Sequence, residues 1–429
     1  MDRKRRIGVY LGARQVLDNP AYVPTLRDHI GLNLAVIEYS GQVSPRLAAR
    51  TPFDGLPLSD GCLHDLVCRH LDGGPVDPRE FDQVRRQVGP SVTAGGDDDA
   101  FRQALAALRR AGMEVWICPG AWTLRRLMFC PSHPGTNAWL AGLYAELATR
   151  YEVDGLDVTH ARFPMASFPR GLFACTCGRC VAAAVALGFD MARLVRALTA
   201  ARDRLAAVDV GRLRILADAP GGLGDLWQSV GTDVDLTGWL AFRARLLESR
   251  LQGFRAAVRA AAGPQFVFGT DTHPASLSML VGHDYARWDR YSDFASPLVS
   301  HIAAFVCDTF RVWAQYLIDG QPSLGEAAAL RLVYRFTGYA GLGLPESFAG
   351  FAPDRPERLA SVIPVADLVL CDLRKARALL PADMPSYPII HGTGWPRAAI
   401  DRIVSEAEAM GHDGIVWQGT DELVRFALK

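Results

Sequence analysis

Three cysteines stand close together in the segment Cys175-Thr-Cys177-Gly-Arg-Cys180. Thiolates at this spacing can wrap a soft metal ion, and a structural zinc site takes four ligands in a tetrahedron. Cys130, which begins the segment Cys130-Pro-Ser-His-Pro134, is the natural fourth ligand. The sequence therefore predicts a structural Zn²⁺ site, with unrelated free thiols as the alternative. Its predicted ligands are Cys130, Cys175, Cys177 and Cys180. We predict no organic cofactor.

Three carboxylates stand at the ends of predicted strands: Glu38, Asp157 and Asp271. Glycoside hydrolysis needs two carboxyl groups that flank the scissile bond, one holding a proton and one ionised. Asp157 alternates with apolar neighbours, so its side chain is expected to point into the sheet's enclosed face. We take Asp157 and Asp271, with Glu38 in place of either, as candidate catalytic residues. The alternatives are a structural role for Asp157 beside Arg162 and a helix cap for Asp271.

Polar and aromatic side chains that follow the same strands form a second set of candidates. Histidine, arginine and aspartate can hydrogen-bond sugar hydroxyls, and an indole ring offers a flat face to a pyranose. A large aromatic residue in a loop more often marks a binding site, although core packing explains Trp417 equally well. The predicted substrate-binding residues are His160, Arg162, His273, Asp284, Trp122, Trp395 and Trp417. The predicted partner is a small-molecule carbohydrate.

The histidines also allow a different chemistry. His160, His273, His301 and His391 all follow predicted strands, and together with Asp157 they could hold a catalytic divalent metal ion. No His-x-His pair follows the first strand, and none of the four histidines forms a closely spaced ligand pair. A His/Asp divalent-metal isomerase or hydrolase is therefore kept as an alternative function.

Eight short apolar runs, most of them separated by helical stretches, supply the elements that would position these side chains. Strands that alternate with helices imply right-handed βαβ units and a parallel sheet. Eight such strands suit an α/β fold of the (β/α)₈ TIM-barrel type, whose active site lies at the carboxyl ends of the strands. The predicted strands are 7–11, 34–38, 114–118, 154–159, 265–269, 294–299, 388–391 and 414–417; the clearest predicted helices are 98–112, 137–151, 236–262 and 398–410.

The chain is longer than a minimal barrel and is predicted to form one elaborated (β/α)₈ domain over residues 1–429. Long insertions are expected at about 41–99, 165–232 and 341–386. Long loops in a compact domain usually carry binding or lid functions. The first insertion is expected to contain a helical piece at 64–70. The run 213–216 is an extra strand candidate that we assign to the second insertion.

Composition narrows the class of partner. Lys plus Arg and Asp plus Glu both number 46, so the formal net charge is zero, which argues against a nucleic-acid-binding protein. No apolar run is long enough to span a bilayer, and the run 7–11 is too short for a signal-peptide core. We therefore expect a cytoplasmic protein without a membrane or nucleic-acid partner, and the sequence leaves a homo-oligomer open.

The region from about 128 to 190 resembles the zinc-cluster region of family 42 glycoside hydrolases (β-galactosidases). In those enzymes a Cys-Pro segment precedes a similar helix, and a Cys-x-Cys-x-x-Cys segment follows the fourth barrel strand. The resemblance implies that the four cysteines bind zinc as a loop staple. The family's Asn-Glu pair after strand four is replaced here by Thr159-His160-Ala161-Arg162, and strand seven, 388–391, lacks a Glu nucleophile. The catalytic pair of that family is therefore not carried over.

A looser similarity extends over most of the chain, to uncharacterised glycosidase-like barrels. It is carried by Asp154-Gly-Leu-Asp-Val-Thr-His-Ala-Arg-Phe-Pro164, by Gly282-His-Asp-Tyr285 and by Gly411-His-Asp-Gly-Ile-Val-Trp417. It implies a glycoside hydrolase acting on a small glycoside or oligosaccharide through a carboxylate pair. A barrel that binds carbohydrate without catalysis is the alternative, because the Glu residues of family 42 are missing.

Overall fold

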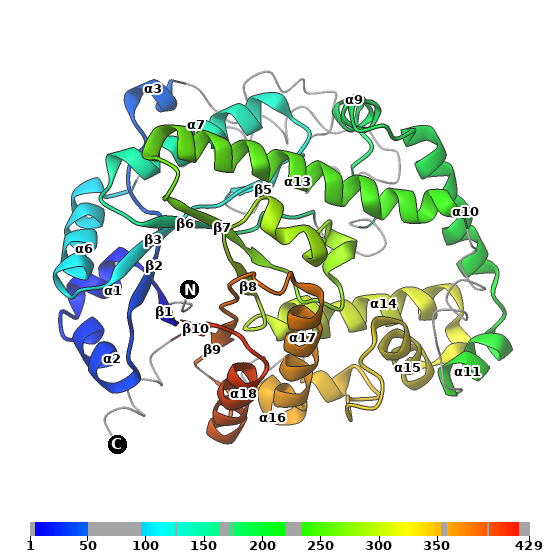
Figure 1. The fold of residues 1–429 in the computed structure, drawn as a ribbon. Helices are drawn as coiled ribbons and strands as arrows, with labels where there is room; N and C mark the ends of the chain where they lie inside the picture. The colour runs from blue at the N-terminus through cyan, green and yellow to red at the C-terminus, as the bar shows by residue number, and fades with distance from the viewer. Residues whose placement is uncertain are drawn as a thin grey trace.

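The structure is a computed structural model of the full chain, shown as a ribbon in Figure 1. It describes residues 5–49, 96–124, 127–163, 172, 175–218, 233–352, 358–392 and 394–419. The helical piece predicted at 64–70 lies outside these residues, as do most of the first predicted insertion and parts of the other two.

Eight parallel strands form one sheet that closes on itself. The strands are β1 (Arg6–Leu11), β2 (Leu34–Glu38), β3 (Glu114–Cys118), β6 (Gly155–Val158), β7 (Val267–Thr272), β8 (Ala295–Pro297), β9 (Ile389–His391) and β10 (Gly414–Gln418). Their order is β8-β7-β6-β3-β2-β1-β10-β9, and parallel bridges from Ala295 to Ser386 and from Leu298 to Ile389 join the two ends. The predicted (β/α)₈ barrel is confirmed, and each of the eight predicted runs contains all or part of one strand.

The barrel interior is filled by alternate residues of these strands. Trp116 and Phe294 stack inside it with ring centroids 4.5 Å apart. Gly155 and Gly269 on the neighbouring strands make room for these rings, because a Cβ atom at Gly269 would lie 2.4 Å from Phe294. Leu34, Val36 and Val416 belong to the same buried cluster. The interior is thus a packed aromatic core and not a channel.

An ion pair closes the amino-terminal end of the barrel. Arg6, at the start of β1, pairs with Glu114 at the start of β3, with Nη2 and Oε1 2.9 Å apart. The Arg6 guanidinium also lies over the rings of Trp116, at 5.1 Å, and Tyr387, at 5.3 Å, and Nη1 donates to the Tyr387 hydroxyl at 2.5 Å. A guanidinium that contacts aromatic faces and a carboxylate together forms a tightly packed floor.

Helices surround the barrel and connect its strands (Figure 1). The helices are α1 (Ala13–Asp18), α2 (Tyr22–Ile30), α3 (Pro45–Ala48), α6 (Asp98–Arg110), α7 (Pro134–Arg150), α9 (Gly178–Ala186), α10 (Met191–Ala207), α11 (Val210–Asp218), α13 (Val234–Ala262), α14 (Asp308–Gly320), α15 (Glu326–Thr337), α16 (Leu359–Val362), α17 (Val365–Leu379) and α18 (Arg397–Ala409). Short 3₁₀ or π segments are η2 (Ser278–Val281), η3 (Tyr285–Arg290), η4 (Ala303–Cys307), η5 (Pro322–Leu324) and η6 (Ala349–Phe351). A short antiparallel pair, β4 (Thr123–Leu124) with β5 (Leu127–Met128), follows β3.

One predicted element differs in the structure. The run 213–216, taken as an extra strand candidate, lies inside helix α11. Leu213 and Ala217 of that helix are buried at an i, i+4 spacing, which is the period of a helix and not of a strand. A run of four residues is too short to distinguish the two periods. None of the helices in the described ranges is both long and apolar enough to cross a membrane.

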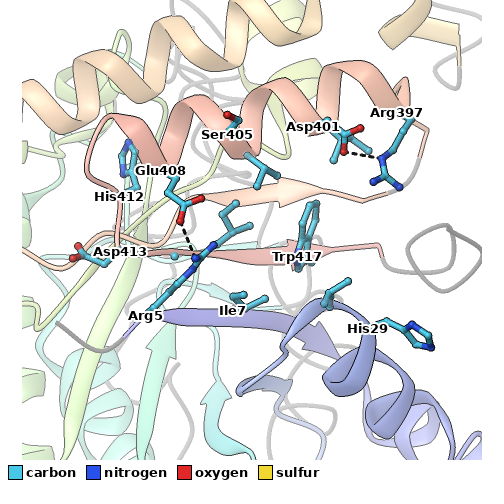
Figure 2. Close-up of a pocket in the computed structure, with 15 residues that line it drawn as sticks. Arg5, Ile7, His29, Arg397, Asp401, Ser405, Glu408, His412, Asp413 and Trp417 are labelled. Atoms are coloured by element: carbon cyan, nitrogen blue, oxygen red, sulfur yellow. Dashed lines mark hydrogen bonds and ion pairs between the residues drawn. The ribbon is translucent and has the colours of Figure 1, made fainter. Parts of the chain in front are cut away.

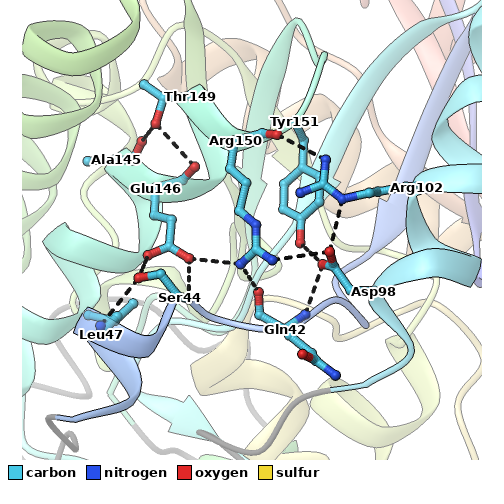
Figure 3. A network of polar contacts seen from close by, with 10 residues as sticks. All are labelled: Gln42, Ser44, Leu47, Asp98, Arg102, Ala145, Glu146, Thr149, Arg150 and Tyr151. Carbon is cyan, nitrogen blue, oxygen red and sulfur yellow. Dashed lines mark hydrogen bonds and ion pairs between the residues drawn. The ribbon is translucent and has the colours of Figure 1, made fainter.

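A polar network anchors the chain that leaves β2 (Figure 3). Asp98 of α6 accepts hydrogen bonds from Arg102 Nε at 2.9 Å, from Arg150 Nη2 at 3.1 Å and from the Tyr151 hydroxyl at 2.5 Å. It also accepts from the backbone N–H of Gln42 at 3.2 Å. Segment 41–49 is thereby tied to α6 and α7.

Candidate functional site

Asp157 lies on β6, inside the carboxyl end of the barrel, with 1% of its surface exposed. Its Oδ2 accepts a hydrogen bond from the hydroxyl of Tyr10 on β1. Its Oδ1 is buried and has no hydrogen-bond partner among the described residues. Burial, together with the charge of Asp271 and against the Tyr10 hydrogen bond, raises the pKa of Asp157 to about 7. Asp157 is therefore a carboxyl group that keeps a proton near neutral pH.

Asp271, near the end of β7, is the second buried carboxyl group. Its Oδ2 accepts a hydrogen bond from Thr159 Oγ1 at 2.9 Å, and its Oδ1 accepts a longer one from Thr270 Oγ1 at 3.4 Å. Asp271 pairs in register with Ser296 of β8. Because its charge acts on the pKa of Asp157, the two carboxyl groups belong to one electrostatic site.

Glu38 ends β2 with an exposed side chain. Its register partner on β3 is Cys118. Burial raises the pKa of the Cys118 thiol well above its usual range, and the charges of Asp157, Asp271 and Glu38 act in the same direction. All three predicted carboxylates therefore surround one buried thiol, with Glu38 on the solvent side.

Two histidines and an arginine stand beside the carboxyl groups. His160 has a φ of 58°, a left-handed conformation that is rare outside glycine and asparagine. Its Nδ1 lies 3.0 Å from Thr159 Oγ1. The Arg162 guanidinium lies 4.7 Å above the ring of Phe305, and the His301 ring stacks on the same Phe305 at 5.3 Å. We call Asp157, Asp271, Glu38, His160, Arg162, His301 and Phe305 the mouth cluster.

Charge in the mouth cluster follows from burial. Burial and the neighbouring His391, opposed by Asp271, lower the pKa of His301 to about 4. Burial likewise lowers the pKa of His160, against the raising effect of Asp271. The pKa of Arg162 is lowered by burial, with Asp271 again opposing. At neutral pH the two imidazoles are therefore uncharged.

His273 lies behind the mouth cluster. It is 2% exposed, and neither ring nitrogen has a hydrogen-bond partner among the described residues. Its ring centroid lies 5.0 Å from that of Phe305. Burial lowers its pKa well below the usual value, so the ring packs as a neutral group against Phe305.

The remaining predicted binding residues lie in different places. Trp122 is fully buried and donates from Nε1 to Asn137 Oδ1 at 2.8 Å. Trp395 is buried, and its ring lies 6.2 Å from that of His391, the last residue of β9. Asp284 caps η3, accepting from the backbone N–H of Ala286 at 3.2 Å. The structure thus places Trp395 near the mouth cluster, and Trp122 and Asp284 in packing or capping positions.

Trp417 faces outward from β10 and lines a groove of about 680 Å³ between α2 and α18 (Figure 2). The groove has an apolar base that includes Ile7 and Ile415. Its rim carries ion pairs such as Arg5 with Glu408, at 2.8 Å. None of its lining residues belongs to the mouth cluster.

The four predicted zinc ligands come together. The Sγ atoms of Cys130, Cys175, Cys177 and Cys180 all lie within 4.8 Å of one another. A Zn–S bond of about 2.3 Å implies tetrahedral S···S separations of about 3.8 Å; the Cys130–Cys177 pair measures 3.9 Å and the Cys130–Cys180 pair is closer, at 3.3 Å. The backbone N–H of Ser132 donates to Cys130 Sγ at 3.4 Å, which suits a thiolate. The donor set fits a structural Zn²⁺.

No other metal-binding group is found in the described part of the chain, where only the four thiols bring three or more ligand atoms close together. The four histidines proposed with Asp157 as metal ligands do not converge in this way. The geometry therefore gives no support to a His/Asp divalent-metal site among these residues.

Four residues of the site were not predicted from the sequence: Tyr10, Thr159, Phe305 and Ser300, whose Oγ lies 3.1 Å from His301 Nδ1. Tyr10 alternates with the outward residues of β1, so its inward position could have been read from the period of the strand. Thr159 and Ser300 directly precede His160 and His301 and carry no signature of their own. Phe305 lies in the π-helical segment η4, a feature frequent at functional sites but without a sequence signal.

No family model matches the chain. No curated sequence matches it either. Among solved structures, the PgaB (BpsB) glycoside hydrolase domain from Bordetella bronchiseptica is 12% identical, with a TM-score of 0.46 over 98% of this chain and 95% of that one. The catalytic domain of β-amylase from Paenibacillus polymyxa is 11% identical, with a TM-score of 0.44 over 99% and 97%. Alpha-L-fucosidase isoenzyme 2 from Paenibacillus thiaminolyticus is 10% identical, with a TM-score of 0.32 over 97% and 64%. With TM-scores below 0.5, these similarities carry no argument about substrate or mechanism, and the resemblance to family 42 has no support from them.

Proposed function

We propose that the protein is a glycoside hydrolase whose carboxylate pair is Asp157 and Asp271. One observation carries the proposal: two buried carboxyl groups at the carboxyl end of the barrel sit in unlike environments. Asp157 has a single hydroxyl donor, no partner at Oδ1 among the described residues and a pKa of about 7, whereas both carboxylate oxygens of Asp271 accept from hydroxyls, those of Thr159 and Thr270. Paired carboxyl groups with separated protonation states are what acid–base cleavage of a glycosidic bond requires.

The roles follow from these environments. Asp157 would donate its proton to the leaving oxygen, because it is still protonated near neutral pH. Asp271 would act as the ionised partner, either as nucleophile or as base toward water. Arg162, which lies near Asp271, would offset part of the negative charge at this point. Glu38, exposed at the rim, would contact a bound sugar as a hydrogen-bond acceptor.

Hydrolysis of a panel of p-nitrophenyl glycosides, in both anomeric forms, tests the proposal. We expect Asp157→Asn and Asp271→Asn each to lower kcat/KM by about 10²–10⁴-fold. Asp401→Asn, which removes an exposed carboxylate paired with Arg397 on α18, is the matched control and should keep wild-type activity. Full activity in Asp157→Asn would refute the assignment. Sugar binding without turnover in the wild type would indicate a non-catalytic carbohydrate-binding barrel.

We further propose that the four cysteines hold one structural Zn²⁺. The ion would supply the charge that organises four thiolates into a staple between the segment before α7 and the start of α9. Metal analysis should find one zinc per chain, and Cys177→Ser should remove it and lower the melting temperature. A wild-type protein that contains no zinc after expression with added zinc would contradict this proposal.

A further inference from the structure

The hydroxyl of Thr159 fixes the tautomer of His160. Thr159 Oγ1 lies 2.9 Å from Asp271 Oδ2 and 3.0 Å from His160 Nδ1. Thr159 donates its single hydroxyl proton to Asp271 Oδ2. The contact with His160 then requires the imidazole to donate from Nδ1. His160 is therefore protonated on Nδ1, and its Nε2 carries a lone pair.

The same arrangement occurs across the mouth at His301. Ser300 Oγ donates to Gln418 Oε1 at 2.6 Å and lies 3.1 Å from His301 Nδ1. With the hydroxyl proton of Ser300 used on Gln418, His301 must also donate from Nδ1. The segments that follow β6 and β8 thus carry the same arrangement, a hydroxyl residue followed by a histidine whose Nε2 is left as an acceptor.

The two histidines have neighbours in common: Arg162 acts on the pKa of both, and the Arg162 guanidinium and the His301 ring both lie on the ring of Phe305. His160 and His301 are both half-buried, and His160 acts electrostatically on the pKa of His301. In the described part of the chain neither Nε2 atom has a hydrogen-bond partner. The Phe305 ring supports His301 from one side, and His160 is held in its left-handed conformation. Backbone strain of this kind persists where the surroundings over-determine it, often at a binding site.

We propose that His160 and His301 are a preset pair of hydrogen-bond acceptors for two hydroxyl groups of the substrate. This inference rests on the proposed function for the substrate's identity as a glycoside and deepens it by naming the class. The substrate is an uncharged, polyhydroxylated sugar ring whose hydroxyls donate hydrogen bonds to the Nε2 atoms of His160 and His301. Sugars that offer only acceptors here, such as deoxyfluoro or O-methyl derivatives, are rejected. Neither histidine is assigned a proton-transfer step.

The tautomers can be read directly, without any substrate. In protein labelled with ¹⁵N-histidine, long-range ¹H–¹⁵N correlation at neutral pH should show His160 and His301 as neutral Nδ1–H forms, assigned by their loss in His160→Gln and His301→Gln. Thr159→Val should abolish the preference at His160 and leave His301 unchanged, and Ser300→Ala should do the reverse. An Nε2–H form or an imidazolium at either residue in the wild type would overturn the inference.

Amide substitutions test the acceptor role. Glutamine can place an oxygen where Nε2 lies, whereas asparagine reaches only the Nδ1 position. On a hydrolysed glycoside we expect His301→Asn to raise KM by about 10-fold with little change in kcat, the loss of one hydrogen bond, and His301→Gln to restore most of the affinity. Equal KM values for the two variants would overturn the inference.

The two proposals fail in distinguishable ways. If no glycoside is hydrolysed, the proposed function fails, and the acceptor pair is judged by titrating the labelled protein with D-glucose, D-galactose, D-mannose and their methyl glycosides. The Nε2 resonances of His160 and His301 should then move together for at least one sugar and remain still for its deoxyfluoro analogue. Nε2 resonances that respond to none of these sugars would overturn the inference.

Discussion

Two shielded aspartates of this protein have opposite protonation behaviour. Asp157, in the barrel mouth, receives one hydroxyl hydrogen bond and leaves Oδ1 without a donor, and its pKa is raised to about 7. Asp98, in the network of Figure 3, receives hydrogen bonds from Arg102, Arg150, Tyr151 and the backbone of Gln42. Burial raises the pKa of Asp98, but those hydrogen bonds outweigh it and hold the pKa below its usual value.

The two sites differ in burial and in donors: Asp157 is fully buried with one hydroxyl donor, whereas Asp98 is half-buried with four donors, and both differences favour opposite charge states. The Asp98 site is complete without any ligand and serves to fix segment 41–49. The Asp157 site is incomplete, because no described group donates a hydrogen bond to Oδ1 and so stabilises the anion. An incomplete polar site weakens the fold and is typical of residues retained for function.

The same substitution should therefore have opposite effects at the two sites, and the largest is expected at Asp157. The folded-state pKa of about 7 lies above the unfolded value of about 3.9. Stability from this group is fully present below about pH 4 and is lost as the pH rises through 7. Asp157→Asn removes the titration, so the variant should gain up to about 4 kcal/mol relative to wild type between pH 4 and pH 9. Urea unfolding at several pH values measures this, and a pH-independent difference would contradict it.

Asp98→Asn should have the opposite sign and a smaller size. The variant loses charge-assisted hydrogen bonds from two arginines, which we expect to lower the free energy of unfolding at pH 7 by about 2 kcal/mol. Because the folded-state pKa of Asp98 is depressed, its contribution is present above the unfolded pKa of about 3.9 and is lost as the pH falls through the folded value. The gap between variant and wild type should therefore close in acid. Asp401→Asn, at an exposed pair, is the control and should change stability little.

The smallest effect is expected from Tyr10→Phe. The Tyr10 hydroxyl lowers the pKa of Asp157 by donating to its carboxylate. Without it, the alkaline limb of the kcat/KM profile should move to higher pH, because the general acid stays protonated longer. Tyr144→Phe is the control, since the Tyr144 hydroxyl is buried and donates to the carbonyl of Gly120, at 2.9 Å, and not to a carboxylate. A limb that moves equally in both variants, or that moves downward in Tyr10→Phe, would count against the role of Asp157.

The fold could be predicted because each barrel strand is a local signal. An apolar run between amphipathic helices is visible in a short window, and each of the eight runs contains all or part of a strand. The prediction ended β7 too early, at 269, whereas the strand continues to Thr272 and includes Asp271. Polar residues at a barrel mouth resemble a turn in sequence, although they are still paired in the sheet. The short run 213–216 was misread for lack of length.

The arrangement of the site was only partly predictable. The inward direction of Asp157 follows from strand alternation, and the convergence of the four thiols from their spacing. The hydrogen bond from Thr159 to Asp271 depends on the register between β6 and β7, and the hydrogen bond between Tyr10 and Asp157 depends on closure of the barrel. Register and closure are properties of the whole sheet, which no single segment encodes.

The packed amino-terminal end of the barrel has a consequence for proton exchange at Asp157. Arg6, Glu114, Trp116 and Tyr387 pack the amino-terminal end, so we expect protons to reach Asp157 from the carboxyl end of the barrel, where the proposed substrate would bind. A ligand bound in the mouth would block access of bulk water to the Asp157 proton until the ligand dissociates. Hydrogen–deuterium exchange at this carboxyl group would then report whether a ligand is bound in the mouth, because the bound state would slow the exchange.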